Sequence, residues 1–478
     1  MVVIMAGMGN NLNLFGIVLR AFPSYAYKQY LIALLFLCVS SSNLLAMDWE
    51  VVPSVGADVS YTDNVYLSKD KQYDTIFRVS PAIRLTGKAN RASLNLNYAL
   101  NATSYADNTS DDKLTNSLNS DANIIFLENI LFLDLSADVR QRAVSNSAVV
   151  GADQLSITDD YSEVTTTQIS PYIDTLLGKY IYLVMRYSYT NTSYQESSLD
   201  SAESETGAVS ASISSASNGS RVNWAVNYFA RDTRYGEDSD EAKFERINGV
   251  LSISPSLNWE IISSVGYERN DYVTTDIAED TERETYGIGL QWRPSATTRF
   301  KVMGQSRYSG DSVTIELDHQ RGRTEFSFSY MEDLTVDSSA KFETVNLGSV
   351  SNGVFLQKRG SLRLSRRFIR SNLSLSIQSD EREYQNSDQE ERTIATNVGW
   401  SRKLSPRTDL NISLGWNQSD FAGSEREDES KSTNIGVSHR FGKRTTATLE
   451  YDNITRTSSD ISAEYERNLV TAGIRIIF

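Results

Sequence analysis

Apolar and polar residues alternate along most of this chain, and this alternation limits its fold more than any other feature. It is clear in 93–100 (SLNLNYAL), 372–378 (NLSLSIQ) and 409–416 (DLNISLGW). Successive side chains of a β-strand point to opposite faces, so these segments predict a sheet with one apolar and one polar face. Helical periodicity is not found at comparable length.

Two all-β architectures share this pattern: soluble antiparallel sheets with a dry inner face, and membrane barrels with a lipid-facing exterior and a polar lumen. Strand length separates them, because soluble strands usually have about 5 to 6 residues whereas membrane strands need roughly 9 to 11. The segments 92–105, 180–190, 258–272 and 407–418 all reach the longer class. Length therefore favours a large closed antiparallel transmembrane barrel.

Connections between the predicted strands alternate between short turns and mostly longer, polar loops. The ten short turns are expected at 87–91, 127–129, 175–179, 217–221, 254–259, 293–299, 319–323, 367–371, 402–407 and 440–444. The eleven outer loops are expected at 63–73, 105–115, 142–160, 194–205, 231–243, 270–283, 308–312, 331–359, 380–391, 419–431 and 456–463. The result is about 22 strands, within a range of roughly 18 to 24, with short periplasmic turns and long external loops, as in bacterial outer-membrane barrels.

The sign of the charge also differs between the short turns and the outer loops. Four outer loops hold 21 acidic and 7 basic residues, whereas five short turns hold 13 basic residues and no acidic one. The loops are 231–243, 270–283, 380–391 and 419–431, and the turns are 293–299, 319–323, 366–371, 402–407 and 440–444. A soluble sandwich has no reason to separate charge by turn parity. The net charge of -15 thus belongs mainly to acidic external loops.

Aromatic residues gather near both kinds of connection. Tryptophans lie in or close to short turns, at Trp224, Trp259, Trp292 and Trp400. Tyrosines lie near the starts of outer loops, at Tyr61, Tyr105, Tyr272, Tyr308, Tyr330 and Tyr384. Amphipathic rings favour the two membrane–water interfaces, so these residues predict an inner and an outer girdle.

The two ends of the chain resemble export and assembly signals. Lys28, the apolar run 31–39 and the small residues that lead to a cleavage point after Ala46 predict a signal peptide over residues 1–46. The run is shorter than the roughly 20 apolar residues that span a bilayer as a helix. The alternating segment 470–478 ends at Phe478 and resembles the terminal strand that the barrel assembly machinery recognises. We expect residues 47–478 to form one barrel domain.

Several segments resemble the outer-membrane proteins associated with PEP-CTERM and exosortase systems, a family of large predicted barrels often encoded with exopolysaccharide genes. They are 61–68 (YTDNVYLS), 79–87 (VSPAIRLTG) with 94–98 (LNLNY), 290–300 (LQWRPSATTRF) and 318–330 (DHQRGRTEFSFSY). The resemblance implies an outer-membrane location and a context of surface polysaccharide or protein sorting. It implies no catalytic residue. Because the chain does not end in a PEP sorting motif, it would be a companion of that system and not its cargo.

The composition excludes several functional classes. The lone Cys38 excludes a disulfide scaffold and thiolate zinc sites, and two histidines are too few for a three-histidine zinc site. A pI of about 4.8 disfavours binding to nucleic acid. Outer-membrane phospholipases and proteases rely on a histidine near a serine or an acidic residue. His319 and His439 lie near short turns, away from the predicted outer rim, so we expect no enzyme, and no catalytic, cofactor-binding or metal-ligating residue.

Two kinds of charge cluster remain. The acidic runs 107–112 and 237–241 do not match the spacing of a calcium loop and are expected to be solvated loops. The strongest basic run consists of Lys358, Arg359, Arg363, Arg366, Arg367 and Arg370. Alternation directs Arg363 and Arg367 into the lumen, where they could guide an anionic polymer, pair with lumen acids or sit at the periplasmic rim.

Barrels of this size have a wide lumen. Twenty-two strands spaced about 4.8 Å apart and tilted about 40° give a diameter of roughly 40 to 45 Å. Such barrels are often plugged, and we expect the outer loops, above all 331–359, to fold inward, or else the lumen to be open.

These observations favour a non-enzymatic outer-membrane barrel of a Gram-negative bacterium that supports export or surface anchoring of exopolysaccharide. Its expected partners are outer-membrane lipids, the barrel assembly machinery through the strand ending at Phe478, and exopolysaccharide with its export proteins, but not nucleic acid. A general porin-like solute channel is the first alternative. A secreted all-β adhesin without membrane insertion is the second.

Overall fold

The computed structural model describes most of the chain after residue 46. The described ranges are 47–107, 110–143, 154–158, 161–195, 203–216, 220–235, 240–272, 281–307, 310–336, 354–384, 389–421 and 425–478. Residues 1–46 lie outside them, so the signal peptide stays a prediction. Among the described residues there is no helix with the length and apolar character needed to cross a membrane.

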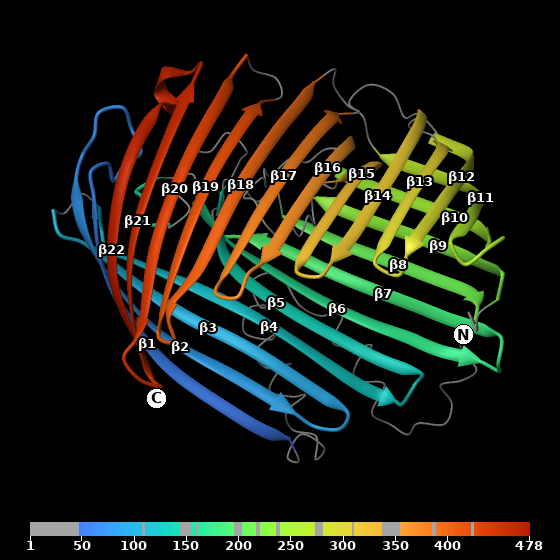
Figure 1. Ribbon diagram of the computed structural model, residues 1–478, viewed down its shortest axis with the longest axis horizontal. Coiled ribbons are helices and arrows are strands. Elements are labelled where there is room, and N and C mark those ends of the chain that lie inside the picture. Colours follow the sequence, from blue (N-terminus) through green and yellow to red (C-terminus); the bar gives the residue numbers. More distant parts are fainter. Residues whose placement is uncertain are drawn as a thin grey trace.

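The chain forms one closed antiparallel barrel of 22 strands (Figure 1). The strands are β1 (Asp48–Thr62), β2 (Asp74–Lys88), β3 (Ala92–Tyr105), β4 (Lys113–Leu127), β5 (Leu131–Ala143), β6 (Tyr161–Leu177), β7 (Ile181–Tyr194), β8 (Ser204–Ser215), β9 (Val222–Tyr235), β10 (Asp240–Ile253), β11 (Trp259–Tyr272), β12 (Thr281–Ser295), β13 (Thr298–Arg307), β14 (Gly310–Arg321), β15 (Thr324–Val336), β16 (Val354–Arg367), β17 (Ser371–Tyr384), β18 (Glu390–Ser405), β19 (Thr408–Asp420), β20 (Glu427–Arg440), β21 (Thr445–Ser458) and β22 (Tyr465–Ile477). A single turn of 3₁₀-helix, η5 (Ile461–Ala463), precedes β22. The predicted strand number and closed architecture are confirmed.

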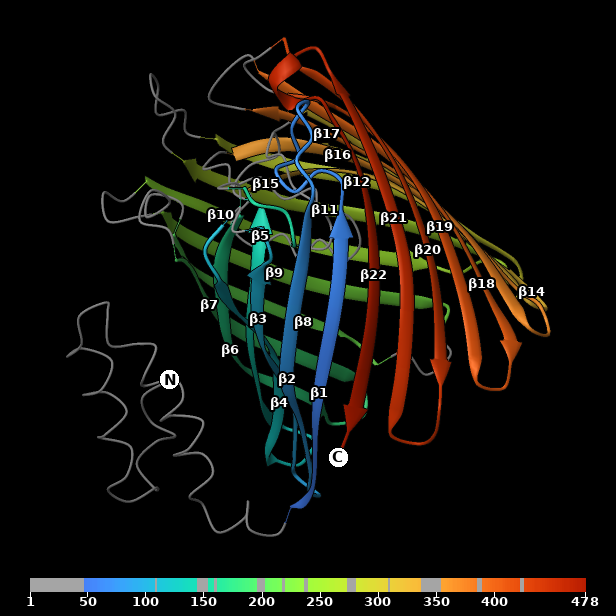
Figure 2. The same cartoon turned by 90° about the vertical axis from the view of Figure 1, so that its left-hand side faces the viewer.

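The barrel closes where the first and last strands meet. Residues 54–62 of β1 pair antiparallel with residues 469–477 of β22, whereas β1 and β2 pair along their whole length. Figure 2 shows β1 and β22 side by side and running in opposite directions. The backbone N–H of Phe478 donates to the carbonyl oxygen of Pro53 at 2.9 Å, so the carboxyl end is held at the short-turn end of this seam.

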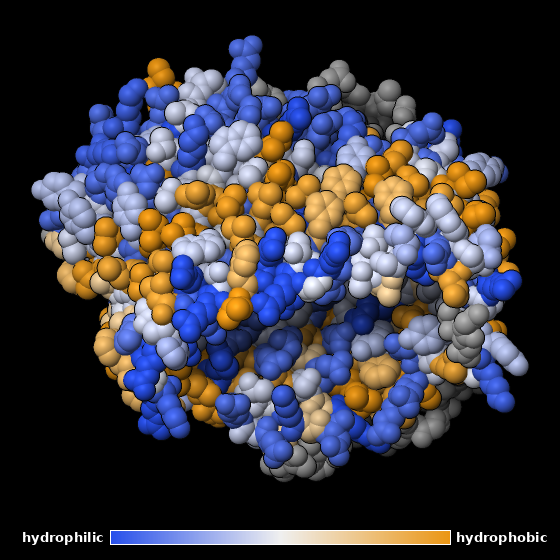
Figure 3. Space-filling view, in the orientation of Figure 1, coloured by the Kyte–Doolittle hydropathy of each residue, from blue (hydrophilic) through white to orange (hydrophobic). Residues whose placement is uncertain are grey.

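The two faces of the sheet differ as the alternation predicts. On β1, Val51, Val55 and Val59 lie on the exposed outer face, and Val55 and Val59 are opposite Ile476 and Ala472 of β22. Figure 3 shows apolar side chains as a band across the wall, with polar surface on either side of it. Because the strands form a closed barrel, the other face, which is rich in serine and asparagine, lines the lumen.

The short-turn girdle lies where it was expected. Trp224, Trp259 and Trp292 are about two-fifths exposed on the outer face, and the rings of Trp259 and Trp292 stack at 5.6 Å. Trp400 lies opposite Leu373 on the same face.

The outer girdle is only partly as predicted. Tyr61 is exposed on the outer face, and Tyr330 shares that face with Ile315. Tyr105 and Tyr384, by contrast, belong to the inner face, opposite Ile76 and Phe355, and the ring of Tyr105 is buried. Alternation along a strand decides which face a side chain points to, whatever its distance from the loop. Tyr308 and the side chain of Tyr272 lie outside the described residues.

Every predicted connection falls between two strands, but the outer strand ends extend further than predicted. The loop expected at 231–243 shrinks to 236–239, and the loop expected at 331–359 shrinks to 337–353. Polar residues were interpreted as loop, yet the antiparallel ladder continues through them because their charges pair across neighbouring strands. Lys358 and Arg359 therefore belong to β16.

Candidate functional site

The lumen is the candidate site, and its outer end is partly filled by two loops. The loop between β1 and β2 brings Val65 over Ile76, Tyr105 and Leu469, all of which are buried on the lumen side. Residues 154–158, from the connection between β5 and β6, add Leu155 to this cluster. Thus outer loops do fold inward, but within the described residues they are 63–73 and 154–158. The predicted inward loop, 337–353, lies outside the described residues.

Hydrogen bonds tie the two loops to each other and to the wall. The N–H of Ile157 donates to the carbonyl of Val65 at 2.8 Å, and the hydroxyl of Tyr105 donates to the carbonyl of Leu155 at 3.1 Å. The guanidinium of Arg467, on β22, donates to the hydroxyl of Ser156 at 2.9 Å. These contacts hold both loops against the inner wall beside the seam.

Asn64 clamps the first loop to the seam. Its side chain is fully buried, and its amide nitrogen donates to the carbonyls of Ser68 at 2.6 Å and Glu466 at 3.0 Å. Its amide oxygen accepts from the N–H of Ser68 at 3.2 Å. One side chain therefore both shapes the loop and joins it to β22.

Asp63 adds a charged contact to the same clamp. Its carboxylate accepts from the backbone and side chain of Asn468 at 2.7 and 2.9 Å and from Lys71 at 3.0 Å. Burial opposes the charge, but these hydrogen bonds outweigh it and hold the pKa of Asp63 below its usual value. The hydrogen bond to Asp63 raises the pKa of Lys71.

Inward-facing charges near the outer strand ends form closed networks. Arg307 donates to Glu268 at 3.0 Å and to Asp333 at 2.6 Å. Arg456 donates through Nε to Asp428 at 2.9 Å. The side chains of Arg456 and Asp428 are 8% and 4% exposed, so both charges depend on each other.

The middle of the lumen wall from β15 to β20 is lined by small hydroxyl and amide side chains. This serine–asparagine wall consists of Ser327, Ser329, Ser361, Ser374, Ser376, Gln378, Asn397, Asn411, Ser413, Asn417, Ser432 and Asn434, which share the inner face by register. Arg363 interrupts it, between Ser327 and Ser376. Arg363 is exposed, and among the described residues it has no hydrogen-bond or ion-pair partner.

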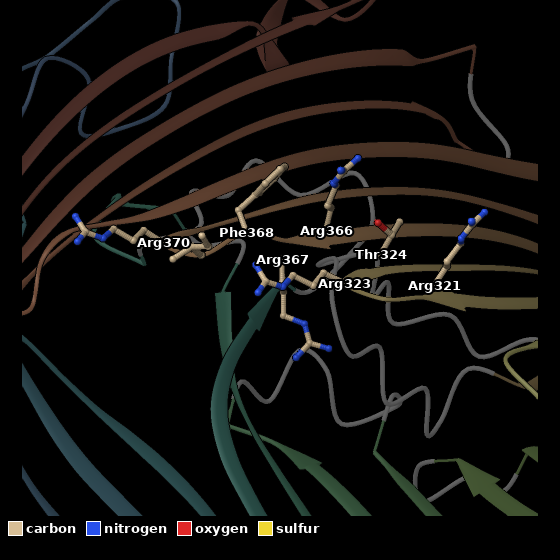
Figure 4. A pocket seen from close by; sticks show the side chains of 8 residues that line it. Arg321, Arg323, Thr324, Arg366, Arg367, Phe368 and Arg370 are labelled. Atoms are coloured by element: carbon tan, nitrogen blue, oxygen red, sulfur yellow. The ribbon is translucent and has the colours of Figure 1, made fainter.

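The short-turn end of the same sector carries a hollow lined with arginine. The turn between β14 and β15 and the turn between β16 and β17 are neighbours, because β15 pairs with β16. Their side chains line an open hollow of about 690 Å³, formed by Arg321, Arg323, Thr324, Arg366, Arg367, Phe368, Ile369 and Arg370 (Figure 4). We call the five arginines of this hollow the turn-side arginine cluster.

Local geometry explains how two turns present so many cations. Gly322 has φ of +60°, a conformation that suits glycine and allows a tight turn between Arg321 and Arg323. The second turn is closed by the N–H of Phe368, which donates to the carbonyl of Ser371 at 2.7 Å. Figure 4 shows that the side chains of Arg321 and Arg366 extend away from those of Arg323 and Arg367.

The basic run of the sequence is therefore divided between two places. Lys358 pairs with Glu381 and Glu383, and Arg359 donates to Asp380 at 3.0 Å, all near the outer strand ends. The other members lie toward the short turns, where Arg367 pairs with Glu325. The expected inward direction of Arg363 and Arg367 agrees with the register. What the sequence reasoning missed is the contribution of Arg321 and Arg323, although adjacent hairpins follow from the order of the strands.

Neither histidine has the surroundings of a catalytic base. Nδ1 of His319 lies 2.8 Å from the hydroxyl of Thr298, and Nδ1 of His439 lies 2.9 Å from that of Thr408. Asp318, the sequence neighbour of His319, points to the other face and pairs with Arg299 at 2.6 Å. Both imidazoles are at short-turn strand ends, as expected.

The acidic runs are described only in part. Residues 108–109 and 237–239 lie outside the described ranges, while Glu241 pairs with Arg234 and Lys243. Within the described ranges, the histidine, cysteine and acidic side chains do not form a group of three that could hold a metal ion.

Comparison with known proteins identifies the class of fold. No protein-family model matches the chain, and no curated protein sequence matches it either. Among solved structures, the FrpB iron transporter of Neisseria meningitidis is similar with a TM-score of 0.51 and 10% identity, covering 89% of this chain and 82% of that one. The siderophore receptor PirA of Acinetobacter baumannii gives 0.52 and 9%, covering 90% and 80%.

A third neighbour is the ferric-catecholate import receptor Fiu of E. coli K12, with a TM-score of 0.50, 8% identity and coverage of 89% and 81%. At this level of identity the likeness concerns the fold alone. The chain has the barrel fold of outer-membrane transporters and receptors.

Proposed function

We propose that this protein is a non-enzymatic outer-membrane barrel that supports export or surface anchoring of an exopolysaccharide. The proposal places it in the outer membrane of a Gram-negative bacterium, in the context of a PEP-CTERM and exosortase system, which is the family that its sequence resembles. Its insertion would depend on the barrel assembly machinery acting on β22 and on Phe478, which follows that strand.

The serine–asparagine wall carries this proposal. Polysaccharides present hydroxyl groups at every sugar, and hydroxyl and amide side chains exchange hydrogen bonds with them in either direction. A transported chain must be bound well enough to enter and weakly enough, at many equivalent positions, to move on. A long stretch of wall that is polar, small and almost uncharged meets this requirement. A lumen of roughly 40 to 45 Å backbone diameter leaves room for a polymer even beside inward loops.

The contacts of Asn64 and Asp63 with β22, which we call the seam clamp, support a role in surface anchoring as well as in passage. The segment 61–68, one of those that carry the family resemblance, is the segment that forms the buried loop around Asn64. A loop fixed this firmly at the outer mouth gives a defined surface to which an emerging polymer can bind.

A porin-like channel for small solutes is the second candidate. It is favoured by the fold shared with an iron transporter and with a siderophore receptor. The exposed apolar band argues against the third reading, a secreted adhesin, because such a band requires lipid around it (Figure 3).

Deletion of the gene, with rescue by the intact copy, tests the proposal. We expect loss of surface polysaccharide in the deletion strain and its return on rescue, while unchanged polysaccharide would count against an export role. Two controls concern the barrel itself. Heat-modifiable migration of the protein from outer-membrane extracts checks insertion, and planar-bilayer conductance without polymer checks the channel alternative.

A further inference from the structure

We propose that the lumen-facing arginines of the short-turn end bind the carboxylate or phosphate groups of an acidic polysaccharide as the chain enters the barrel. This inference rests on the proposed function and names the chemical class of its substrate. A neutral glycan would need only the serine–asparagine wall.

The turn-side arginine cluster is a concentration of positive charge with few acids near it. Five arginines line one hollow, with the side chains of Arg321 and Arg366 directed away from those of Arg323 and Arg367, and the lining residues include no carboxylate. Arg367 is paired with Glu325. Arg321, Arg323 and Arg370 have no ion-pair partner among the described residues. In a protein with a net charge of -15, such a local excess of positive charge stands out.

The charge continues from the rim into the lumen. Arg363 lies on the same face of β16 as Arg367, four residues further in, which corresponds to about 13 Å along a strand. Figure 3 shows polar surface below the apolar band, at the edge of the hollowed centre of the molecule. An anionic chain that meets Arg323 at the rim can therefore reach Arg363, which lies within the serine–asparagine wall.

Guanidinium suits this task for a chemical reason. Its planar donors match the two oxygens of a carboxylate or phosphate, and it stays charged at any physiological pH. Sites exposed to water bind each anionic group weakly, so a polymer with many such groups gains affinity from several contacts and can still move.

A lipid headgroup is the competing ligand, and the register separates the two. Arg321 and Arg366 lie on the outer face with Thr324, where a phospholipid headgroup would meet them. Arg363 lies on the inner face, which lipid does not reach. The inward arginines therefore favour a polymer in the lumen over a lipid at the wall.

The test compares two double variants of the full-length barrel in nanodiscs of zwitterionic lipid. Arg323→Gln with Arg363→Gln removes inward charge, and Arg321→Gln with Arg366→Gln removes the same charge from the outer face. Arg367 is left intact, since its loss would leave Glu325 without its partner. The probes are oligogalacturonate, a carboxylated glycan, and dextran of equal length, with binding measured by calorimetry at low and high salt.

We expect oligogalacturonate to bind the unmodified barrel more tightly than dextran does, and less tightly at high salt. The inward double variant should weaken this binding by about tenfold or more, since each lost guanidinium removes charge-assisted hydrogen bonds to the carboxylates of the glycan. The outward double variant should change it by less than about twofold. Heat-modifiable migration of each variant checks that the barrel is folded.

Equal binding by the inward variant and the unmodified protein would overturn the inference. So would loss of binding in the outward variant only, together with a preference for phosphatidylglycerol vesicles, which would assign the cluster to lipid. Failure of this inference differs from failure of the proposed function. If the barrel does not bind oligogalacturonate but the deletion strain lacks polysaccharide, export stands and the polymer is neutral. If oligogalacturonate binds but the deletion leaves polysaccharide unchanged, the anion site stands without the export role.

Discussion

The outer strand ends and the turn-side arginine cluster use charge in opposite ways. Near the outer strand ends, inward-facing charges such as Arg307 and Arg456 are buried and paired with carboxylates. At the short-turn end, Arg321, Arg323 and Arg370 lie around an open hollow whose lining includes no acid. The first arrangement stabilises the barrel, because a buried charge needs its partner. The second leaves its charges available to a ligand. The difference teaches that exposure and pairing, and not the number of charges, distinguish structural from functional ionic groups here.

Among the variants that test this comparison, Asp428→Ala should lower the stability of the barrel most. Its carboxylate accepts from Arg456, Arg426 and Ser458 on the inner face near the outer end. Without it two guanidinium groups lose the carboxylate that they share, and loss of one partner of a buried pair costs about 3 to 5 kcal/mol. Urea unfolding of the barrel refolded into lipid vesicles measures the change in free energy. A loss below about 1 kcal/mol would show that this network is not structural.

Asn64→Ala should have the next largest effect, and it should be local. The change removes three hydrogen bonds of a fully buried side chain and leaves the carbonyl of Glu466 without its donor. An unsatisfied buried group costs about 1 to 3 kcal/mol. We expect trypsin to cleave after Lys69 or Lys71 in the variant much faster than in the unmodified barrel.

The matched control for this clamp is Asn258→Ala, an exposed asparagine at a short turn. Its replacement should leave trypsin cleavage in 63–73 unchanged. If Asn64→Ala is as resistant as the control, the loop is held by its apolar contacts and not by the asparagine.

Part of the fold could be predicted from the sequence, and part could not. The alternation in 92–105 predicts β3 with the bounds that the structure has, because a period of two is a local property. The outer ends of strands such as β16 were missed, since charges paired across strands look like loop until the register is known. The direction of Tyr105 was available from parity and was misjudged from its position.

The candidate site, like the fold, could be predicted from the sequence only in part. The inward direction of Arg363 is readable from alternation, and the adjacency of the two arginine turns follows from the pairing of β15 with β16. The contact between Val65 and Leu155 is not readable, since it joins two outer loops far apart in sequence and depends on closure of the barrel.

Acidification should loosen the clamp by a smaller amount. The folded state lowers the pKa of Asp63, so this carboxylate stabilises the loop above its unfolded pKa of 3.8 and loses that contribution as the pH falls through the folded value. Lys71, whose pKa is raised, stays charged throughout that range and adds no pH dependence there. Because Asp63 is partly exposed, we expect its ionised carboxylate to contribute less than about 1 kcal/mol to the stability of the loop. The rate of hydrogen exchange in 63–73, corrected for intrinsic rates, should rise by about fivefold or less as the pH is lowered from about 6 to about 3.

The variant Asp63→Asn serves as the control for that measurement. It retains an acceptor for Asn468 but has no titrating group, so exchange in 63–73 should no longer depend on pH in this range. If the pH dependence persists in Asp63→Asn, another acid controls the loop.

Asp409→Ala should have the smallest effect, and it completes the comparison with Asp428. Asp409 also faces the lumen and lies 3.7 Å from the guanidinium of Arg440, but at the short-turn end, where the two side chains are 33% and 51% exposed. Water solvates both charges there, so loss of the carboxylate should cost less than about 1 kcal/mol in the same urea titration. A cost equal to that of Asp428→Ala would mean that the short-turn end is held together by its charges as well. The turn-side arginines would then be part of the structural framework, and their availability to an anionic polymer would have to be reconsidered.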